Sequence, residues 1–480
     1  MRLRPVVVER FTKKVAPVDA VDRLPQEPHR FLLESGGGPQ DISAWSFFGY
    51  KPFLVLQAWG TTVEVTDASG TVRRQINPFD AVDEILQKYP VERVPDVPPF
   101  CGGLVGYFSY DAGRSLERLP DTAVDDLGLP DVYLCAYDAV AAVNHVTGET
   151  TVLALPVPGR TEEGLRTARE LITCIREAGE RPGRAMKAYP EVAVHSNFAP
   201  EDYRKAVARA IEYVYAGDIF QVNLAQRFTA DLPLSPWELY VRLRAVNPAP
   251  FAAFLDAGGF QVVSASPERF LLVTPTPDGV RVETRPIKGT RRRGSNPAED
   301  AARRRELEES LKDRAELYMI VDLERNDLGR VCQFGTVKVP DRRRVEAYPT
   351  VFHTVATVEG TLRPDVTPGR LLKATFPGGS ITGAPKIRAM EIIEELEGLR
   401  RGVYCGSLGY LSFAGDLDLN IVIRTMVCQD GRVYFHAGGG IVADSDPEAE
   451  YQETLDKAKA LFNALLGKEI EGEQQPCSCG

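Results

Sequence analysis

Three glutamates occupy positions where a carboxylate needs a cationic partner. Glu316 lies in a predicted helix that is apolar almost all round. Burying its charge alone would cost several kcal/mol, so its partner is either an arginine or a cation. Glu450, Glu453 and Lys457 share one face of the last predicted helix at spacing i, i+3 and i+7. That spacing alone favours an exposed Glu–Lys ion pair, whereas two carboxylates from separate helices, together with waters, would suit Mg²⁺.

A lysine stands between an apolar residue and a Gly-Thr turn, Lys288 in the run TRPIKGT. Desolvation that lowered its pKa from about 10.4 would make it a nucleophile. Each unit of lowering costs about 1.4 kcal/mol. The pattern alone therefore favours an ordinary surface lysine on a turn.

Polar groups also interrupt two apolar, strand-like runs. His353 is either a core histidine with satisfied hydrogen bonds or an acid or hydrogen-bond donor to a substrate. Arg424 needs an anionic partner inside its apolar run, and a substrate carboxylate held by two hydrogen bonds fits. Nearby, Gly438, Gly439 and Gly440 let backbone N–H groups approach an anion closely.

Two further runs resemble known functional motifs but lack residues that those motifs require. The run PGGSITGAPK lacks the GK[ST] ending of a nucleotide-binding phosphate loop, because Ala384 and Pro385 separate its last glycine from the lysine. Cys405 follows Tyr404 in the order of a nucleophile elbow, but the flanking Gly and Gln of glutamine amidotransferases are missing. A buried structural cysteine is the better interpretation.

The composition narrows the class of protein. The 480 residues have a net charge of −10, which opposes general binding to nucleic acid or anionic membranes. The arginine runs 291–293 and 303–305 are interpreted as solvated surface. Six cysteines are scattered singly, with Cys477 and Cys479 in a polar tail, as in a reduced protein. No signal peptide and no membrane-spanning run is found, so we expect a cytoplasmic protein.

The elements that position these residues follow from hydrophobic periodicity and caps. Short β-like runs are frequent in residues 1–190, which end in a polar linker near 180–184. Residues 191–466 mix helices and strands, and 467–480 form a polar tail. Helices and strands do not alternate strictly, which predicts an α+β fold with mostly antiparallel sheets. The expected helices start at Pro200, at Asn296-Pro297 with a capping box to Glu299, at Asp313, at Lys386 and at Asp446-Pro447. The last of these helices carries the apolar stripe Tyr451, Leu455, Ala458, Phe462 and Leu465. The expected strands are 220–228, 404–413, 417–427 and 433–436.

Taken together, the motifs are far more specific than any one of them. SASPERF, RPIKGT, DLERNDLGR, PGGSITGAPK and GGGIVADSDPEAEYQETLDKA occur in that order. The chain resembles the chorismate-utilising enzymes of the anthranilate synthase component I and aminodeoxychorismate synthase component I family, from Phe31 to about Leu466. The resemblance implies an anthranilate synthase component I-like fold, a mostly antiparallel β-sandwich core flanked by helices.

The resemblance also implies a chorismate site with one Mg²⁺. It assigns the metal to Glu316 and Glu453, with Glu450 in support. It assigns the substrate carboxylates to Tyr404, Arg424, Gly438, Gly439 and Gly440, a further cationic contact to Lys457, and positions near the ring and the departing hydroxyl to Gly289, Thr290 and His353.

One position bears on the reaction. Related salicylate and isochorismate synthases carry a water-activating lysine where this chain has Gln221. Glutamine is no general base, so addition of ammonia, not water, is expected at this substrate-binding position. The motifs PIKGT, PGGSITGAPK and GGGIV resemble the aminodeoxychorismate synthase branch, in which Lys288 would attack C2 of chorismate. The alternative is the anthranilate synthase branch, which typically reads PIAGT and releases pyruvate.

The chain shows no convincing glutamine amidotransferase motif, so the resemblance implies a separate subunit that supplies ammonia. It further implies a tryptophan pocket formed by Glu34 and Ser35 of LLES together with Asn77 and Pro78. Two readings from other classes stay open at this point. Lys288 could form a Schiff base with pyridoxal phosphate, or the chain could be an inactive chorismate or tryptophan sensor, which the presence of every expected glutamate opposes.

Overall fold

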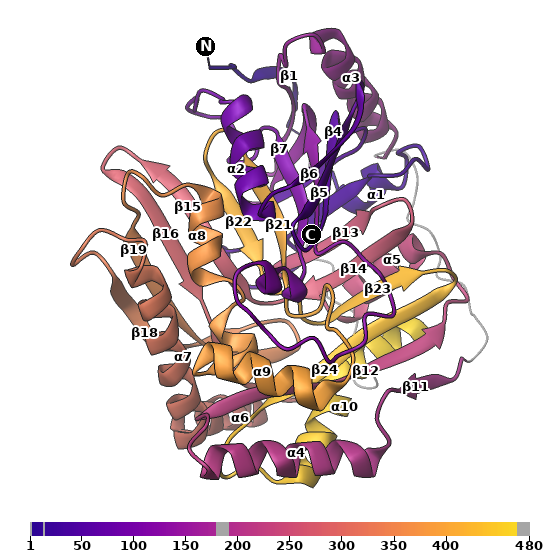
Figure 1. Ribbon diagram of the computed structural model, residues 1–480. Coiled ribbons are helices and arrows are strands. Elements are labelled where there is room, and N and C mark those ends of the chain that lie inside the picture. The colour runs from indigo at the N-terminus through magenta and orange to yellow at the C-terminus, as the bar shows by residue number, and fades with distance from the viewer. Residues whose placement is uncertain (1, 13–14, 179–191, 468–480) are drawn as a thin grey trace.

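Two antiparallel sheets form the body of the molecule in the computed structural model, which describes residues 2–12, 15–178 and 192–467 (Figure 1). The first sheet has the order β1 (Val6–Phe11), β10 (Thr150–Ala154), β9 (Ala139–Asn144), β3 (Trp45–Gly49), β2 (Phe31–Glu34), β13 (Phe251–Asp256), β14 (Phe260–Ser266), β23 (Thr425–Gln429), β24 (Arg432–Ile441), β12 (Gln221–Asp231) and β11 (Val194–Ser196), and β20 (Gly383–Ala384) pairs with β12.

The second sheet has the order β17 (Ile287–Arg292), β19 (Val351–Thr361), β16 (Gly279–Arg285), β15 (Arg269–Thr276), β22 (Leu417–Asn420), β21 (Ser407–Ser412), β7 (Gly103–Phe108), β8 (Val132–Tyr137), β4 (Leu54–Trp59), β5 (Thr62–Asp67) and β6 (Gly70–Gln75), and β18 (Lys338–Ala347) pairs with β19. The two sheets pack against each other through aromatic side chains. Phe47 of the first sheet meets Tyr410 of the second edge-on at 5.3 Å between ring centroids. This is the mostly antiparallel sandwich of an α+β fold.

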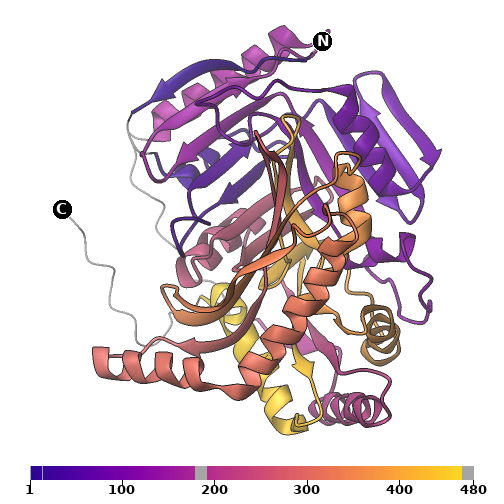
Figure 2. The same cartoon turned by 90° about the vertical axis from the view of Figure 1, so that its left-hand side faces the viewer.

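Helices cover the remaining faces. They are α1 (Pro17–Val21), α2 (Pro78–Lys88), α3 (Thr161–Ala178), α4 (Pro200–Tyr215), α5 (Pro236–Val246), α6 (Pro297–Glu309), α7 (Leu311–Gly329), α8 (Pro368–Thr375), α9 (Lys386–Glu397) and α10 (Pro447–Leu466), with short 3₁₀ turns at Tyr110–Ser115 and Gly379–Ile381. Helices α3, α5 and α10 pack on strands of the first sheet. Helices α6 and α7 meet at an angle next to Ser310, the N-cap of α7 (Figure 2).

Both sheets mix strands from the two halves of the chain. Strand β2 pairs with β13 and strand β7 pairs with β21, so early and late segments lie side by side in Figure 1. The division predicted near residue 190 therefore does not divide the sheets. The predicted linker near 180–184, and Cys477 and Cys479, lie outside the described residues.

Several element predictions needed correction. The run 417–427 is not one strand, because β22 ends at Asn420 and β23 starts at Thr425. The strand predicted at 404–413 begins only at Ser407. Helix α7 begins at Leu311, not Asp313, because Ser310 accepts a hydrogen bond from the backbone N–H of Asp313 and caps the helix.

Two details of the predicted helices were also wrong. Asn296 caps α6, but the Glu299 side chain accepts hydrogen bonds from Ser295 and does not close the capping box. The buried face of α10 is rotated toward its polar side, because it faces the candidate site as well as the sheet. That face consists of Glu450, Thr454, Ala458, Leu461, Ala464 and Leu465.

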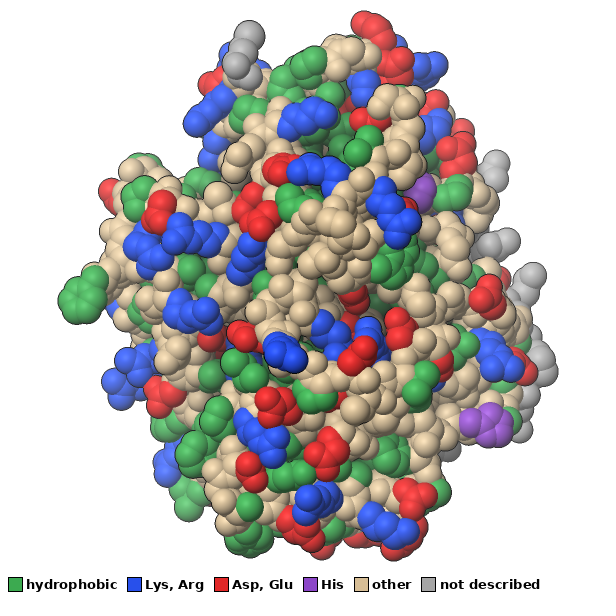
Figure 3. All heavy atoms as spheres, in the orientation of Figure 1, with side chains coloured by type: hydrophobic (Ala, Val, Ile, Leu, Met, Phe, Trp, Pro, Cys, Tyr) green, Lys and Arg blue, Asp and Glu red, His purple; other side chains and the backbone are tan. Residues whose placement is uncertain are grey.

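The surface carries both signs of charge. On the face shown in Figure 3, Lys and Arg side chains are interspersed with Asp and Glu. A search of the described residues finds no helix with the length and apolarity needed to cross a membrane.

Candidate active site

Helices α7 and α10 bring the three predicted metal-binding glutamates into one electrostatic cluster. Glu450 is buried, accepts a hydrogen bond from Ser445 at 2.6 Å and lies 4.0 Å from the ammonium of Lys312. Glu453 forms an ion pair with Lys457 at 2.7 Å. The predicted Glu–Lys pair is therefore present, and Glu453 lies with Glu450 next to Gly439 of β24.

The electrostatics of the cluster favour a cation. Burial raises the pKa of Glu450, and the charge of Glu453 adds to that rise. Burial also raises the pKa of Glu316, against the opposing effect of Lys288 and Lys312. Burial acts in the same direction on Glu453, but Lys457 outweighs it and holds the pKa of Glu453 below its usual range. The negative charge of Glu453 thus raises the pKa of both Glu316 and Glu450, and the neighbouring lysines oppose that effect.

The donor set fits Mg²⁺, which prefers carboxylate oxygens and bound water. Gly439 leaves room beside the donors, because a Cβ atom there would lie 3.0 Å from Oε2 of Glu450 and 3.3 Å from Oε1 of Glu453. No three His, Cys, Asp or Glu side chains of the described residues already form a metal-binding cluster.

Lys288, on β17, lies inside this charged region. Its Nζ donates a hydrogen bond to the carbonyl oxygen of Ser380 at 3.1 Å. Burial lowers the pKa of Lys288, while Glu316 opposes that change and Lys457 adds to it. The lysine is therefore a partly buried amine with access to its neutral form, not the surface lysine that the pattern alone favoured.

Glu268 is the functional candidate that the sequence analysis missed. Its carboxylate is buried and accepts a hydrogen bond from the backbone N–H of Ile287, the residue before Lys288. Burial raises its pKa, and the Ser380 hydroxyl and Lys288 act against that rise. The available signal was the charged residue inside the small-residue run SASPERF, which was used for the family resemblance but given no role.

Strands β17 and β19 pair Thr290 with His353. The Thr290 hydroxyl lies 2.9 Å from Nδ1 of His353, which is 2 % exposed. Burial, together with the nearby charge of Arg424, lowers the pKa of His353 to about 3. Gly289 has a left-handed φ of +84°, so the turn between Lys288 and Thr290 depends on glycine.

Arg424 lies in the break between β22 and β23, with φ +50°, and not inside a strand as predicted. Within the described ranges, no carboxylate lies at ion-pair distance from its guanidinium. Burial lowers its pKa. A buried arginine without a carboxylate partner is a candidate for binding the carboxylate of a ligand.

The three glycines of β24 lie nearby. Gly438, Gly439 and Gly440 pair with β12 on one side. The pairing with β23 ends at Met426 opposite Phe435, so that side of the glycine backbone has no strand partner among the described residues. Lys457 donates to the carbonyl oxygen of Gly438 at 2.8 Å. The unpaired side of the glycine backbone at residues 438–440 therefore lies close to Lys457.

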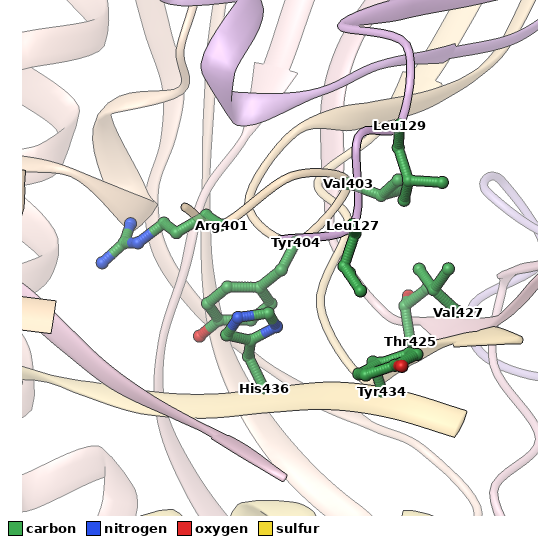
Figure 4. A pocket seen from close by; sticks show the side chains of 9 residues that line it. All are labelled: Leu127, Leu129, Arg401, Val403, Tyr404, Thr425, Val427, Tyr434 and His436. Atoms are coloured by element: carbon green, nitrogen blue, oxygen red, sulfur yellow. The ribbon is translucent and has the colours of Figure 1, made fainter. Parts of the chain in front are cut away.

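Tyr404 lies on the wall of a small cavity. Its ring stacks face to face on His436, with centroids 4.8 Å apart (Figure 4). Leu127 and Leu129 close the other side of the cavity. Cys405, next in sequence, is buried, as predicted for a structural cysteine.

The four predicted tryptophan-pocket residues divide into two pairs. Glu34 accepts hydrogen bonds from Tyr240 and from Arg244, and Ser35 donates to the carbonyl oxygen of Trp45. Asn77 instead caps α2 and donates to Ser115, and Pro78 is the first residue of that helix. The second pair thus lies at the start of α2, and Asn77 links that start to the turn at Ser115. The LLES strand pairs with β3 and β13, and just beyond it Gly36 donates to the carbonyl oxygen of Ala249 in the turn before β13.

The chain is similar along most of its length to known proteins. Residues 28–463 match the family model described as chorismate binding enzyme. Anthranilate synthase component 1 of Thermus thermophilus is 47 % identical over 97 % of this chain and 98 % of its own length. Aminodeoxychorismate synthase component 1 of Escherichia coli is 38 % identical over 96 % of this chain and 99 % of its own. The crystal structure of anthranilate synthase component I from Streptococcus pneumoniae is 32 % identical with a TM-score of 0.77, covering 93 % and 97 % of the two chains.

Proposed function

Since the chain belongs to the chorismate-binding enzyme family, we propose that it transfers ammonia to chorismate and releases 4-amino-4-deoxychorismate, a precursor of 4-aminobenzoate and folate. The placement of Lys288 carries this proposal. Its amine lies in a partly buried, charged region, with a carboxylate next to it in Glu268. A lysine at this point of the site supports covalent catalysis.

Binding comes first in the proposed reaction. Chorismate carries two carboxylates, and the cations of this region include Arg424, which interacts with the charge of Glu268, and Lys457, which interacts with that of Lys288. The guanidinium of Arg424 suits one carboxylate, and the open backbone side of residues 438–440 suits the other. When bound between Glu316 and Glu453, Mg²⁺ would supply positive charge to the ring carboxylate and to the departing oxygen.

Lys288 then attacks C2 as a neutral amine while the C4–O bond breaks. Glu268, whose pKa is raised by burial, is the proposed proton donor to the oxygen that leaves as water. Ammonia next attacks C4, and the C2–N bond to Lys288 breaks. Glu268 takes back the proton that the new amine loses, so Lys288 and Glu268 return to their starting states and the pyruvyl ether is retained.

Neutral His353 offers a hydrogen bond near the reacting ring without adding charge. The component 1 names of the relatives support a second subunit, a glutamine amidotransferase, as the source of ammonia.

Anthranilate synthesis is the second candidate, and the relatives favour it. The 47 % identity to the T. thermophilus anthranilate synthase exceeds the 38 % identity to the E. coli aminodeoxychorismate synthase. Both reactions add ammonia to chorismate, and they differ in whether pyruvate is then eliminated. A few side chains at the site decide that difference, so identity over the whole chain weighs less than the lysine of PIKGT.

A product assay tests the proposal. The purified chain is mixed with chorismate, an ammonium salt at alkaline pH and Mg²⁺, without a partner subunit. An aminated, non-aromatic product without pyruvate is expected. Fluorescent anthranilate with stoichiometric pyruvate would support the second candidate instead, and no consumption of chorismate would contradict both.

A further inference from the structure

Glu324, in the second half of helix α7, is a buried glutamate to which the proposed reaction gives no role. The residue is 7 % exposed, and no described lysine or arginine lies at ion-pair distance from its carboxyl group. Glu268, 4 % exposed, is the other buried glutamate without such a partner. The remaining buried glutamates of the described residues each have an arginine or lysine at ion-pair distance: Glu34, Glu283, Glu346, Glu394, Glu397 and Glu450.

The same short segment of chain holds both of these unpaired carboxyl groups. The Thr284 hydroxyl, near the end of β16, donates to Oε2 of Glu324 at 3.3 Å. The backbone N–H of Ile287, at the start of β17, donates to Oε1 of Glu268 at 3.3 Å. Three residues of extended chain span at most about 10 Å. The two carboxyl groups are therefore anchored close together.

The helix turn that carries Glu324 also packs against the loop that contacts Lys288. A Cβ atom at Gly379 would come within 2.8 Å of Cδ2 of Leu323, the residue before Glu324. The next residue of that loop, Ser380, accepts the hydrogen bond from Nζ of Lys288. Glu324 is thus placed next to the proposed reaction site, although its side chain is directed to Thr284.

The charges around Glu324 favour its protonated form. Burial raises its pKa well above the usual range, and the negative charge of Glu268 adds more to that rise than any other charge does. Asp327, on the same helix, acts in the same direction. Lys386 of α9 opposes them, but its ammonium is paired with Asp327 at 2.6 Å. Glu324 therefore holds a proton for which its surroundings supply no competing cation.

Two interacting carboxyl groups titrate as a pair. When the first proton leaves, the negative charge left behind opposes loss of the second. The pair of Glu268 and Glu324 should therefore keep one proton up to a higher pH than Glu268 would keep its own. That last proton rests on the group with the more favoured neutral form, which is Glu324.

We propose that Glu324 holds a reserve proton that it exchanges with Glu268. In the singly protonated pair, Glu324 passes its proton to the Glu268 carboxylate, which gives it to the departing oxygen as the C4–O bond breaks. The proton that the new amine loses returns to Glu268 and then to Glu324, so both groups regain their starting states. Glu324 acts only through Glu268. The inference rests on the proposed function, because that function supplies Glu268 as proton donor.

The test compares pH–rate profiles of the wild type, Glu324→Gln and Glu324→Met, at saturating chorismate and free ammonia. Both variants should move the falling limb at high pH to lower pH by about one unit, because Glu268 alone then retains the proton. Turnover below that limb and the KM for chorismate should stay within about twofold of the wild type. The methionine variant decides the matter if the glutamine variant does not fold.

Glu394→Gln is the matched control, since it also removes a buried glutamate. Glu394 accepts hydrogen bonds from Arg114 and from the backbone of Thr122, so this variant should lower the melting temperature and leave the profile in place. In a Glu268→Gln background, Glu324→Gln should change turnover no further, because the two residues act in one path.

An unshifted limb in the folded Glu324 variants would overturn the inference. An additional loss of turnover in the Glu268→Gln background would also overturn it, because Glu324 would then act independently of Glu268. A wild-type protein that aminates nothing would contradict the proposed function itself, which separates the two failures.

Discussion

The Thr290 hydroxyl lies 2.9 Å from Nδ1 of His353, across the paired strands β17 and β19. The second ring nitrogen, Nε2, is buried and has no partner among the described residues. The fold thus satisfies only one of the two ring nitrogens of the histidine. Its pKa of about 3 makes it a neutral imidazole near pH 7.

The free energy of unfolding should depend on pH because the His353 ring is buried in its neutral form. The unfolded chain binds a proton at His353 near pH 6.5, and the folded chain binds it only near pH 3. The unfolded state therefore holds more protons between these values, so stability rises with pH across this window and is lost as pH falls. Wild-type unfolding free energy should drop by about 2 kcal/mol from this group between pH 8 and pH 5.

His353→Gln removes the titrating group at similar size. Urea denaturation of both proteins at the two pH values gives the comparison, with each protein serving as its own reference at pH 8. The variant should lose about 2 kcal/mol less than the wild type on acidification. An equal loss in both proteins would contradict a neutral buried His353.

Replacing Lys288 should abolish amination and leave chorismate binding intact. Lys288→Ala is expected to reduce the amination rate by about a hundredfold or more, because no other amine takes over the attack. Chorismate affinity, measured by titration calorimetry, should change little. Lys338→Ala, on the exposed strand β18, serves as the control. A wild-type amination rate in Lys288→Ala would remove covalent catalysis from the proposal.

Local signals explain which parts of the fold could be predicted. Asp446 and Pro447 start α10, and Gly398, with its left-handed φ, ends α9, because caps depend on neighbouring residues. Pairing of β2 with β13 joins segments about two hundred residues apart, and no local pattern encodes such a partner.

The same distinction applies to the site. Glu316, Glu453 and Lys457 could be named because their residue types and the family motifs single them out. Arg424 was placed in a strand, since its apolar neighbours hide the positive φ that breaks the run. Glu268 was missed because its role depends on contact with the backbone of Ile287, which becomes visible only when β17 is folded against it.

The metal assignment predicts a loss that depends on Mg²⁺. Glu453→Gln keeps the size of the side chain and removes the negative charge that a cation requires. Turnover at saturating Mg²⁺ should fall by about a hundredfold or more. Glu448→Gln, on the same helix and paired with Arg204 at 2.6 Å, should behave like the wild type. Undiminished Mg²⁺-dependent turnover in Glu453→Gln would refute the assignment.

Arg424 should act mainly on chorismate binding. Arg424→Ala is expected to weaken binding by roughly 2–5 kcal/mol if the guanidinium meets a buried carboxylate. Arg432→Ala, at the exposed start of β24 and at the opposite end of the β23–β24 pair, serves as the control arginine. Calorimetric titration with chorismate measures both, and an unchanged dissociation constant in Arg424→Ala would place the substrate carboxylate elsewhere.

Glu268 offers the most direct test of the proton path. Glu268→Gln preserves an acceptor for the backbone N–H of Ile287 and so should keep the turn before Lys288 in place. It removes the transferable proton, so the turnover number should fall by about 10²–10⁴-fold with little change in chorismate affinity.

The pH dependence separates this role from a structural one. Burial raises the pKa of Glu268, so its acidic form persists above the usual range of a carboxyl group and disappears as pH rises through the raised value. Wild-type turnover should therefore carry a falling limb at high pH that Glu268→Gln lacks. The rising limb from deprotonation of Lys288 should remain in both proteins, because that amine is intact. A variant that loses activity but keeps the wild-type profile would show that Glu268 supports the strand and does not carry the proton.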